Sequence, residues 1–127
     1  MVEVTATTKR NAPVGAVRVS EIADALLGSR YELSVSFVGR RRAKAANIAT
    51  RGKTYTPNVL SFPISKTEGE ILICQDLLDR ERRAFGLPSR AAAALFLIVH
   101  GCLHLKGMDH GPKMEAIEDR WIERLGS

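Results

Sequence analysis

The sequence predicts a small α+β domain in which a mixed sheet of about four strands packs against four to six helices. Two kinds of segment support this class, because short β-rich segments are interspersed with segments that have helical apolar spacing. The run 91–99 is apolar on every side, as expected for a helix buried in the core. With 127 residues, the chain is expected to form one domain covering residues 1–127.

Four segments are predicted to be strands because β-branched and other apolar residues are concentrated in them and turn residues flank them. In one of them, Leu33, Val35 and Phe37 alternate with polar residues and should face the core. The predicted strands are 2–7, 32–38, 59–63 and 70–74.

Two helices are predicted in the first half of the chain. Residues 19–27 carry apolar side chains on one face, with Ser20 as a possible N-cap. The basic, alanine-rich segment 40–49 is predicted to form a short helix, followed by a loop that runs from Arg51 to Pro57.

The second half of the chain is predicted to be mainly helical. Residues 76–85 form an amphipathic pattern closed by Gly86, and Ser89 is placed to cap the long buried helix. A last helix begins at Pro112, and its apolar face should cover the buried helix. That face consists of Met114, Ile117, Trp121 and Leu125.

The charge of the chain is unevenly distributed. Net charge is +5, but residues 1–66 hold 11 basic and 4 acidic residues, whereas residues 67–127 hold 8 and 10. A basic half of this kind favours a polyanionic partner, of which nucleic acid is the common example. No signal-like or bilayer-length apolar segment occurs, and the two cysteines form no CxxC pair. We therefore expect a cytoplasmic protein without a membrane partner.

All three histidines of the chain lie within eleven residues, at His100, His104 and His110. His100 and His104 are four apart, so on a helix they lie on one face, one turn from each other. Gly107 is placed to end that helix in a left-handed conformation, after which His110 could complete a three-nitrogen face. The buried helix is thus predicted to carry a metal ion.

Zinc is the usual occupant of such a site, and three protein ligands leave one position for water or substrate, as in catalytic zinc sites. Cys102 is about 200° around the helix from His100 and should point away from the ion. The histidine spacing is also that of the metzincin proteases, but their general base, a glutamate after the first histidine, is replaced here by Gly101. This replacement argues against peptide hydrolysis.

Three motifs of the chain together match a known pattern. They are the segment 100–110 (HGCLHLKGMDH), Arg51-Gly52-Lys53 followed by 58–63 (NVLSFP), and the segment 69–74 (GEILIC). In this order they resemble the histidine signature, the arginine loop with its following strand, and a further strand of the YbeY family of bacterial endoribonucleases and ribosomal RNA maturation factors. Met108 stands where the family usually has tyrosine, and the first ~30 residues carry no specific resemblance.

The resemblance implies one zinc ion held by His100, His104 and His110, and cleavage of single-stranded RNA. It further implies maturation of the 3′ end of 16S rRNA, a part in ribosome quality control, and the small ribosomal subunit with its assembly factors as partners. Arg51 would hold the scissile phosphate and stabilise charge in the transition state. Lys53 and Arg41 are candidate contacts to RNA phosphates. Asp109 could accept a hydrogen bond from an imidazole and so orient it.

Two alternative functions remain compatible with the sequence. One is an RNA-binding ribosome assembly factor in which the metal is structural, and the other is a zinc hydrolase acting on a substrate other than RNA. Within the ribonuclease hypothesis, two nucleophiles are compatible with the site: water, and the 2′-hydroxyl of the substrate.

Overall fold

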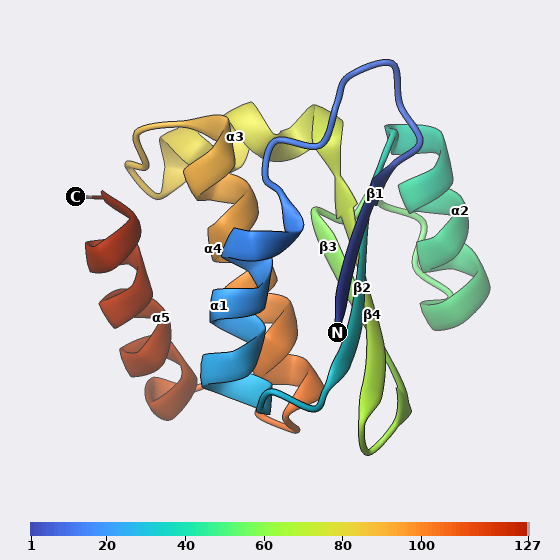
Figure 1. Ribbon diagram of the computed structural model, residues 1–127. Helices are drawn as coiled ribbons and strands as arrows, with labels where there is room; N and C mark the ends of the chain where they lie inside the picture. Colours follow the sequence, from blue (N-terminus) through green and yellow to red (C-terminus); the bar gives the residue numbers. More distant parts are fainter. Residues whose placement is uncertain (127) are drawn as a thin grey trace.

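The computed structural model describes residues 1–126 and confirms a single small α+β domain with a four-stranded sheet and five α-helices in that range (Figure 1). In chain order the elements are β1 (Val2–Ala6), α1 (Ala16–Leu27), β2 (Glu32–Val38), α2 (Arg40–Arg51), β3 (Val59–Ser65), β4 (Glu68–Cys74), the 3₁₀ turn η1 (Gln75–Leu77), α3 (Leu78–Ala84), α4 (Arg90–Leu105) and α5 (Pro112–Gly126).

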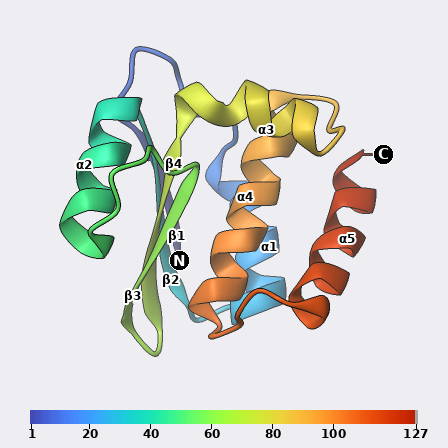
Figure 2. The same cartoon turned by 180° about the vertical axis from the view of Figure 1, so that it is seen from behind.

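The sheet is mixed, with strand order β1-β2-β4-β3. β1, β2 and β4 run parallel, whereas β3 pairs antiparallel with β4 and has no partner on its other side among the described residues. Helices α1 and α4 cover one face of the sheet, α2 lies on the other face, and α5 lies outside α1 and α4 (Figures 1 and 2). β3 is therefore an edge strand with α4 and α2 on either side of it.

The main core lies between the sheet and α4. Leu33, Val35 and Phe37 of β2 are buried, as their alternation predicts, and α4 is buried along most of its length. The last helix covers α4 as expected, because Met114 is fully buried and the other residues of its apolar face pack against the core. The site-bearing helix is thus held on two sides.

Three helix boundaries differ from the prediction. α1 begins at Ala16 with Gly15 as N-cap, so Ser20 lies inside the helix and is not its cap. Its first three residues, 16–18, are exposed and lie before the apolar spacing that marks the rest. α2 continues through Arg51 because Gly52, in a left-handed conformation, ends the helix two residues later than predicted. The third helix starts with η1, and its α-helical part ends at Ala84.

None of the helices between residues 1 and 126 combines the length and the hydrophobicity that a bilayer-spanning helix requires.

Candidate metal centre

Both ends of α4 are fixed by local hydrogen bonds. At its start, the Ser89 hydroxyl accepts a hydrogen bond from the Ala92 N–H, which confirms the predicted N-cap. At its end, Gly107 has φ 95° and donates its N–H to the His104 carbonyl, while the Met108 N–H donates to the Leu103 carbonyl. These two bonds form a Schellman motif, which reverses the chain as the position of Gly107 predicts.

The reversal brings the three histidine rings together. One nitrogen from each of His100, His104 and His110 lies within 4.8 Å of the other two. The ring centroids are 4.6 to 5.2 Å apart. Within residues 1–126, these three residues form the group of histidine, cysteine and acidic side chains that could hold a metal ion. The predicted convergence is therefore present.

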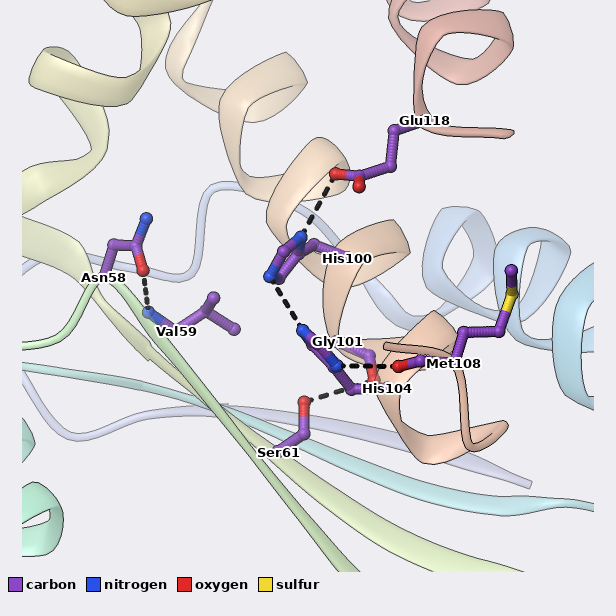
Figure 3. Close-up of polar contacts among 8 residues, drawn as sticks. All are labelled: Asn58, Val59, Ser61, His100, Gly101, His104, Met108 and Glu118. Atoms are coloured by element: carbon purple, nitrogen blue, oxygen red, sulfur yellow. Dashed lines mark hydrogen bonds and ion pairs between the residues drawn. The ribbon is translucent and has the colours of Figure 1, made fainter. Parts of the chain in front are cut away.

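The hydrogen bonds of two rings determine which nitrogen carries the proton (Figure 3). His104 Nδ1 is 3.1 Å from the Met108 carbonyl oxygen, which only accepts, so Nδ1 must be the donor. His100 Nδ1 is likewise 3.1 Å from the Glu118 carboxylate. When both rings are neutral, both Nε2 atoms therefore present lone pairs. These atoms lie 3.1 Å apart, an arrangement that a shared cation stabilises.

The spacing of the His100 and His104 nitrogens and the protonation of His104 fit zinc. Tetrahedral zinc with Zn–N bonds of about 2.0–2.1 Å separates its nitrogens by roughly 3.3 Å, close to the 3.1 Å between the two Nε2 atoms. Burial, together with the neighbouring His100 ring, lowers the pKa of His104 below its usual value, so this ring is neutral at pH 7. Neutral imidazole is the form that binds metal.

Cys102 does not belong to the group, as predicted. Its side chain is fully buried in the main core, and burial raises the pKa of its thiol to about 12. It is therefore a neutral core residue and not a thiolate ligand.

Glu118 is a site residue that the sequence analysis missed. It comes from α5 and accepts the hydrogen bond of His100, and its side chain is only 13% exposed. Its sequence signal is its place in the apolar stripe of that helix, four residues after Met114 and four before Ile122. Asp109, the acceptor expected from sequence, is exposed, and the imidazole hydrogen bonds of residues 1–126 go to Glu118 and Met108 instead.

The three histidines line a cleft of about 530 Å³ that passes along the free edge of β3. Arg51 belongs to another wall of this cleft and is exposed, as the last residue of α2. The further lining residues are Thr50, Tyr55, Pro57, Asn58, Val59, Leu60, Ser61 and Phe62. Lys53 and Arg41 are exposed but do not line the cleft. Arg41 lies ten residues before Arg51 on α2, about 15 Å along the helix axis.

Gly101 occupies a position with no room for a side chain. A Cβ atom there would lie 2.8 Å from Ile71 Cδ1 and 3.0 Å from Ser61 Oγ. The Ser61 hydroxyl donates a hydrogen bond to the Gly101 carbonyl and fixes β3 against α4 at this point (Figure 3). The glutamate base of the metzincin proteases therefore has no place in this packing, which agrees with the sequence argument against peptide hydrolysis.

Residues 6–125 match the family model of endoribonuclease YbeY. The chain belongs to this family. It is 37% identical over 110 residues to the endoribonuclease YbeY of Aromatoleum aromaticum, covering 80% of this chain and 71% of that protein. The identity to the YbeY of Paraburkholderia phymatum is 36% over 112 residues, or 80% and 72% of the two chains. The identity to the endoribonuclease YbeY of Ralstonia nicotianae is 37% over 105 residues. That match covers 75% of this chain and 56% of the Ralstonia protein.

A solved structure has the same fold. The solution structure of TM1509 from Thermotoga maritima superposes with a TM-score of 0.62 at 22% sequence identity, covering 98% of this chain and 89% of that one. The resemblance inferred from the histidine signature, and the fold expected with it, are therefore confirmed.

Proposed function

We propose that this protein is a zinc-dependent endoribonuclease that cleaves single-stranded RNA during ribosomal RNA processing. One observation carries the proposal: the lone pairs of His100 and His104 converge, beside His110, in a cleft that Arg51 also lines. Membership in the YbeY family, whose relatives are named endoribonucleases, supports the reaction class. The basic first half of the chain supports an RNA substrate.

His100, His104 and His110 would hold one zinc ion. When bound, zinc supplies Lewis acidity toward a phosphoryl oxygen and makes water acidic enough to act as nucleophile near neutral pH. Glu118 and the Met108 carbonyl hold the proton of each ring on Nδ1, so that Nε2 of His100 and His104 stays directed into the cleft. Asp109 is adjacent to His110 in sequence and remains our candidate for orienting that ring.

Arg51 would bind the scissile phosphate. Its guanidinium is always charged and can donate two parallel hydrogen bonds to phosphate oxygens, but it cannot act as a base. Its place at the C-terminus of α2 is favourable because the partial negative charge of that helix end stabilises a cation. As negative charge grows on the phosphoryl oxygens, Arg51 would stabilise the transition state more than the ground state.

Lys53 and Arg41 would extend this cationic surface outside the cleft, with contacts to neighbouring phosphates of the same strand. We further propose maturation of the 3′ end of 16S rRNA, a part in ribosome quality control, and a cytoplasmic location. The small ribosomal subunit and its assembly factors would then be the partners. These assignments are supported by membership in the YbeY family and by the excess of basic residues in the first half of the chain.

The proposal is tested by metal analysis of the purified protein, paired with a single-stranded RNA cleavage assay on wild type and Arg51→Glu. We expect about one zinc per chain in both proteins, because Arg51 is not among the proposed ligands. Cleavage by the variant should fall by at least ~10²-fold, the effect of removing one donor that stabilises a transition-state oxyanion. Full activity of Arg51→Glu, or activity that persists without metal, would contradict the mechanism.

A substrate with 2′-deoxyribose at the scissile position distinguishes the two nucleophiles. Loss of cleavage indicates attack by the 2′-hydroxyl, which leaves a cyclic phosphate, and retained cleavage indicates attack by water. The assembly-factor alternative makes a different prediction, namely that Arg51→Glu leaves RNA processing in cells intact while histidine substitutions unfold the protein.

A further inference from the structure

We propose that Tyr55 forms a stacking subsite for an unpaired nucleobase next to the histidine centre. The inference rests on the proposed ribonuclease function and adds the feature of the substrate that the cleft recognises. Arg51 and the histidines act on a phosphodiester that every nucleic acid contains, so they do not explain a preference for single strands. An aromatic face in the same cleft does.

Tyr55 lies in the loop between α2 and β3, and its side chain is exposed in the cleft. The residue is 55% exposed and lines the cleft that Arg51 and the three histidines also line. Phe62, a partly buried residue of β3, lines the same cleft. The cleft therefore combines a guanidinium for a phosphate with aromatic surface for a base.

The backbone at Tyr55 is anchored from beneath. Asn47 of α2 is fully buried, and its Nδ2 donates a hydrogen bond of 3.0 Å to the Tyr55 carbonyl. The Lys53 N–H donates to the Asn47 carbonyl at 3.4 Å, which ties the start of the same loop to the helix. This anchoring fixes the backbone from which the ring projects before RNA arrives, and a preorganised loop loses less entropy on binding.

Asn47 also gives a reason to regard this anchor as functional. Its Oδ1 is buried and has no hydrogen-bond partner within the described residues, a situation that disfavours the folded state. An apolar side chain would avoid that penalty but would leave the Tyr55 carbonyl without its donor. The buried Asn47 side chain therefore lowers stability through its unpaired oxygen, yet it occupies the position that anchors this loop.

A nucleobase is the ligand group that suits an exposed ring beside a cation. Proteins recognise single-stranded RNA by stacking unpaired bases on aromatic side chains, whereas bases in a duplex are paired and stacked on one another. A base stacked on Tyr55 would hold its adjoining phosphate near Arg51. Paired RNA would lose this contact, so the subsite would favour unpaired strands.

The test combines a substitution with base removal. Single-stranded oligoribonucleotides of one sequence, each with a single abasic nucleotide at a different position, are cleaved by wild type, Tyr55→Ala, Tyr55→Leu and Tyr55→Phe. Ile64→Ala is the matched control, because Ile64 is also 55% exposed and follows closely on β3 but does not line the cleft. Melting temperatures of all variants are measured alongside.

We expect one abasic position to lower kcat/KM of wild type by about tenfold, the usual scale for one stacked base. Tyr55→Ala and Tyr55→Leu should lower kcat/KM on the intact RNA by a similar factor, mainly through KM, and should be insensitive to the abasic nucleotide at that position. Tyr55→Phe and Ile64→Ala should behave as wild type. Such non-additivity identifies direct contact between ring and base.

Two results would overturn the inference. One is unchanged kcat/KM in Tyr55→Ala and Tyr55→Leu, and the other is an abasic effect that persists undiminished in these variants. Either result leaves the proposed function intact if the wild-type protein cleaves RNA. Absence of cleavage by the wild-type protein, in contrast, contradicts the proposed function itself and removes the basis of the subsite.

Discussion

The helix α4 and the segment from the end of α2 to β3 form two walls of one cleft, and they are built differently. α4 is buried along most of its length, and its two histidines are held by hydrogen bonds that they donate to Glu118 of α5 and to the Met108 carbonyl in the turn after α4. The other wall carries exposed side chains, Arg51 and Tyr55, on a helix end and a loop. One wall thus belongs to the core, and the other belongs to the surface.

This difference suits the two tasks that we propose for the cleft, which are metal binding by one wall and substrate contact by the other. Nitrogens that are to bind one ion must converge within a few ångströms, and the positions of these histidines are fixed by core packing and by a specific helix terminus. Exposed residues that contact a substrate do not need that support, because their substitution removes few buried contacts. Substitutions in the α4 wall should therefore change metal content or stability, whereas substitutions of Arg51 or Tyr55 should change substrate turnover alone.

The largest effect is expected for His104→Ala. Removing one of three ligands should eliminate stoichiometric zinc and reduce cleavage below detection, because the proposed mechanism depends on the ion. Zinc content and RNA cleavage are measured together, with Lys106→Ala as control. Lys106 is exposed at the end of the same helix, so this variant should keep both properties. Normal cleavage by metal-free His104→Ala would show that the histidine wall and its ion take no part in the reaction.

Glu118→Gln should produce an intermediate effect. The change keeps the size of the side chain but removes the charge that orients His100, and loss of such a partner lowers metal affinity or activity by about 10–100-fold. Competition with a chelator measures the affinity. Glu115→Gln, on an exposed position one turn earlier in α5, is the matched control. Equal affinities of the two variants would remove Glu118 from the site.

The smallest effect is expected for Gly101→Ala, in the buried wall. The added methyl group would meet Ile71 and Ser61, and overpacking of this kind typically costs about 1–3 kcal/mol. Alanine recovers about 1 kcal/mol relative to glycine within a helix, so we expect a net loss of about 1 kcal/mol in the free energy of unfolding. Chemical denaturation measures this difference. A more stable variant would mean that the contact between α4 and β3 is looser than described.

Most of the fold and the grouping of the three histidines follow from signals that are local in sequence. The alternation of Leu33, Val35 and Phe37, the cap at Ser89 and the turn at Gly107 each depend on a few neighbouring residues, and each is found as predicted. The convergence of the histidines also needs only one helix and the turn after it. These features are predictable because short-range geometry determines them.

The features that were missed depend on contacts between distant elements or on small differences in local stability. Glu118 meets His100 across the interface of α4 and α5, and no local pattern specifies that pairing. Arg51 was expected in a loop, but α2 continues through Thr50 and Arg51. The Thr50 hydroxyl donates a hydrogen bond to the Ala46 carbonyl, and Gly52 caps the helix. The cleft wall formed by this helix end therefore depends on local capping interactions that outweigh the weak helical pattern of these residues.

The facing lone pairs of His100 and His104 also have a thermodynamic consequence. In the unfolded chain these nitrogens are hydrated and independent, so a cation that binds them as a set binds the native state preferentially. Such linkage adds about 2.7 kcal/mol to folding when free metal is roughly 100 times its dissociation constant. The melting temperature of this protein would then depend on the concentration of free metal around it as much as on the packing of its core.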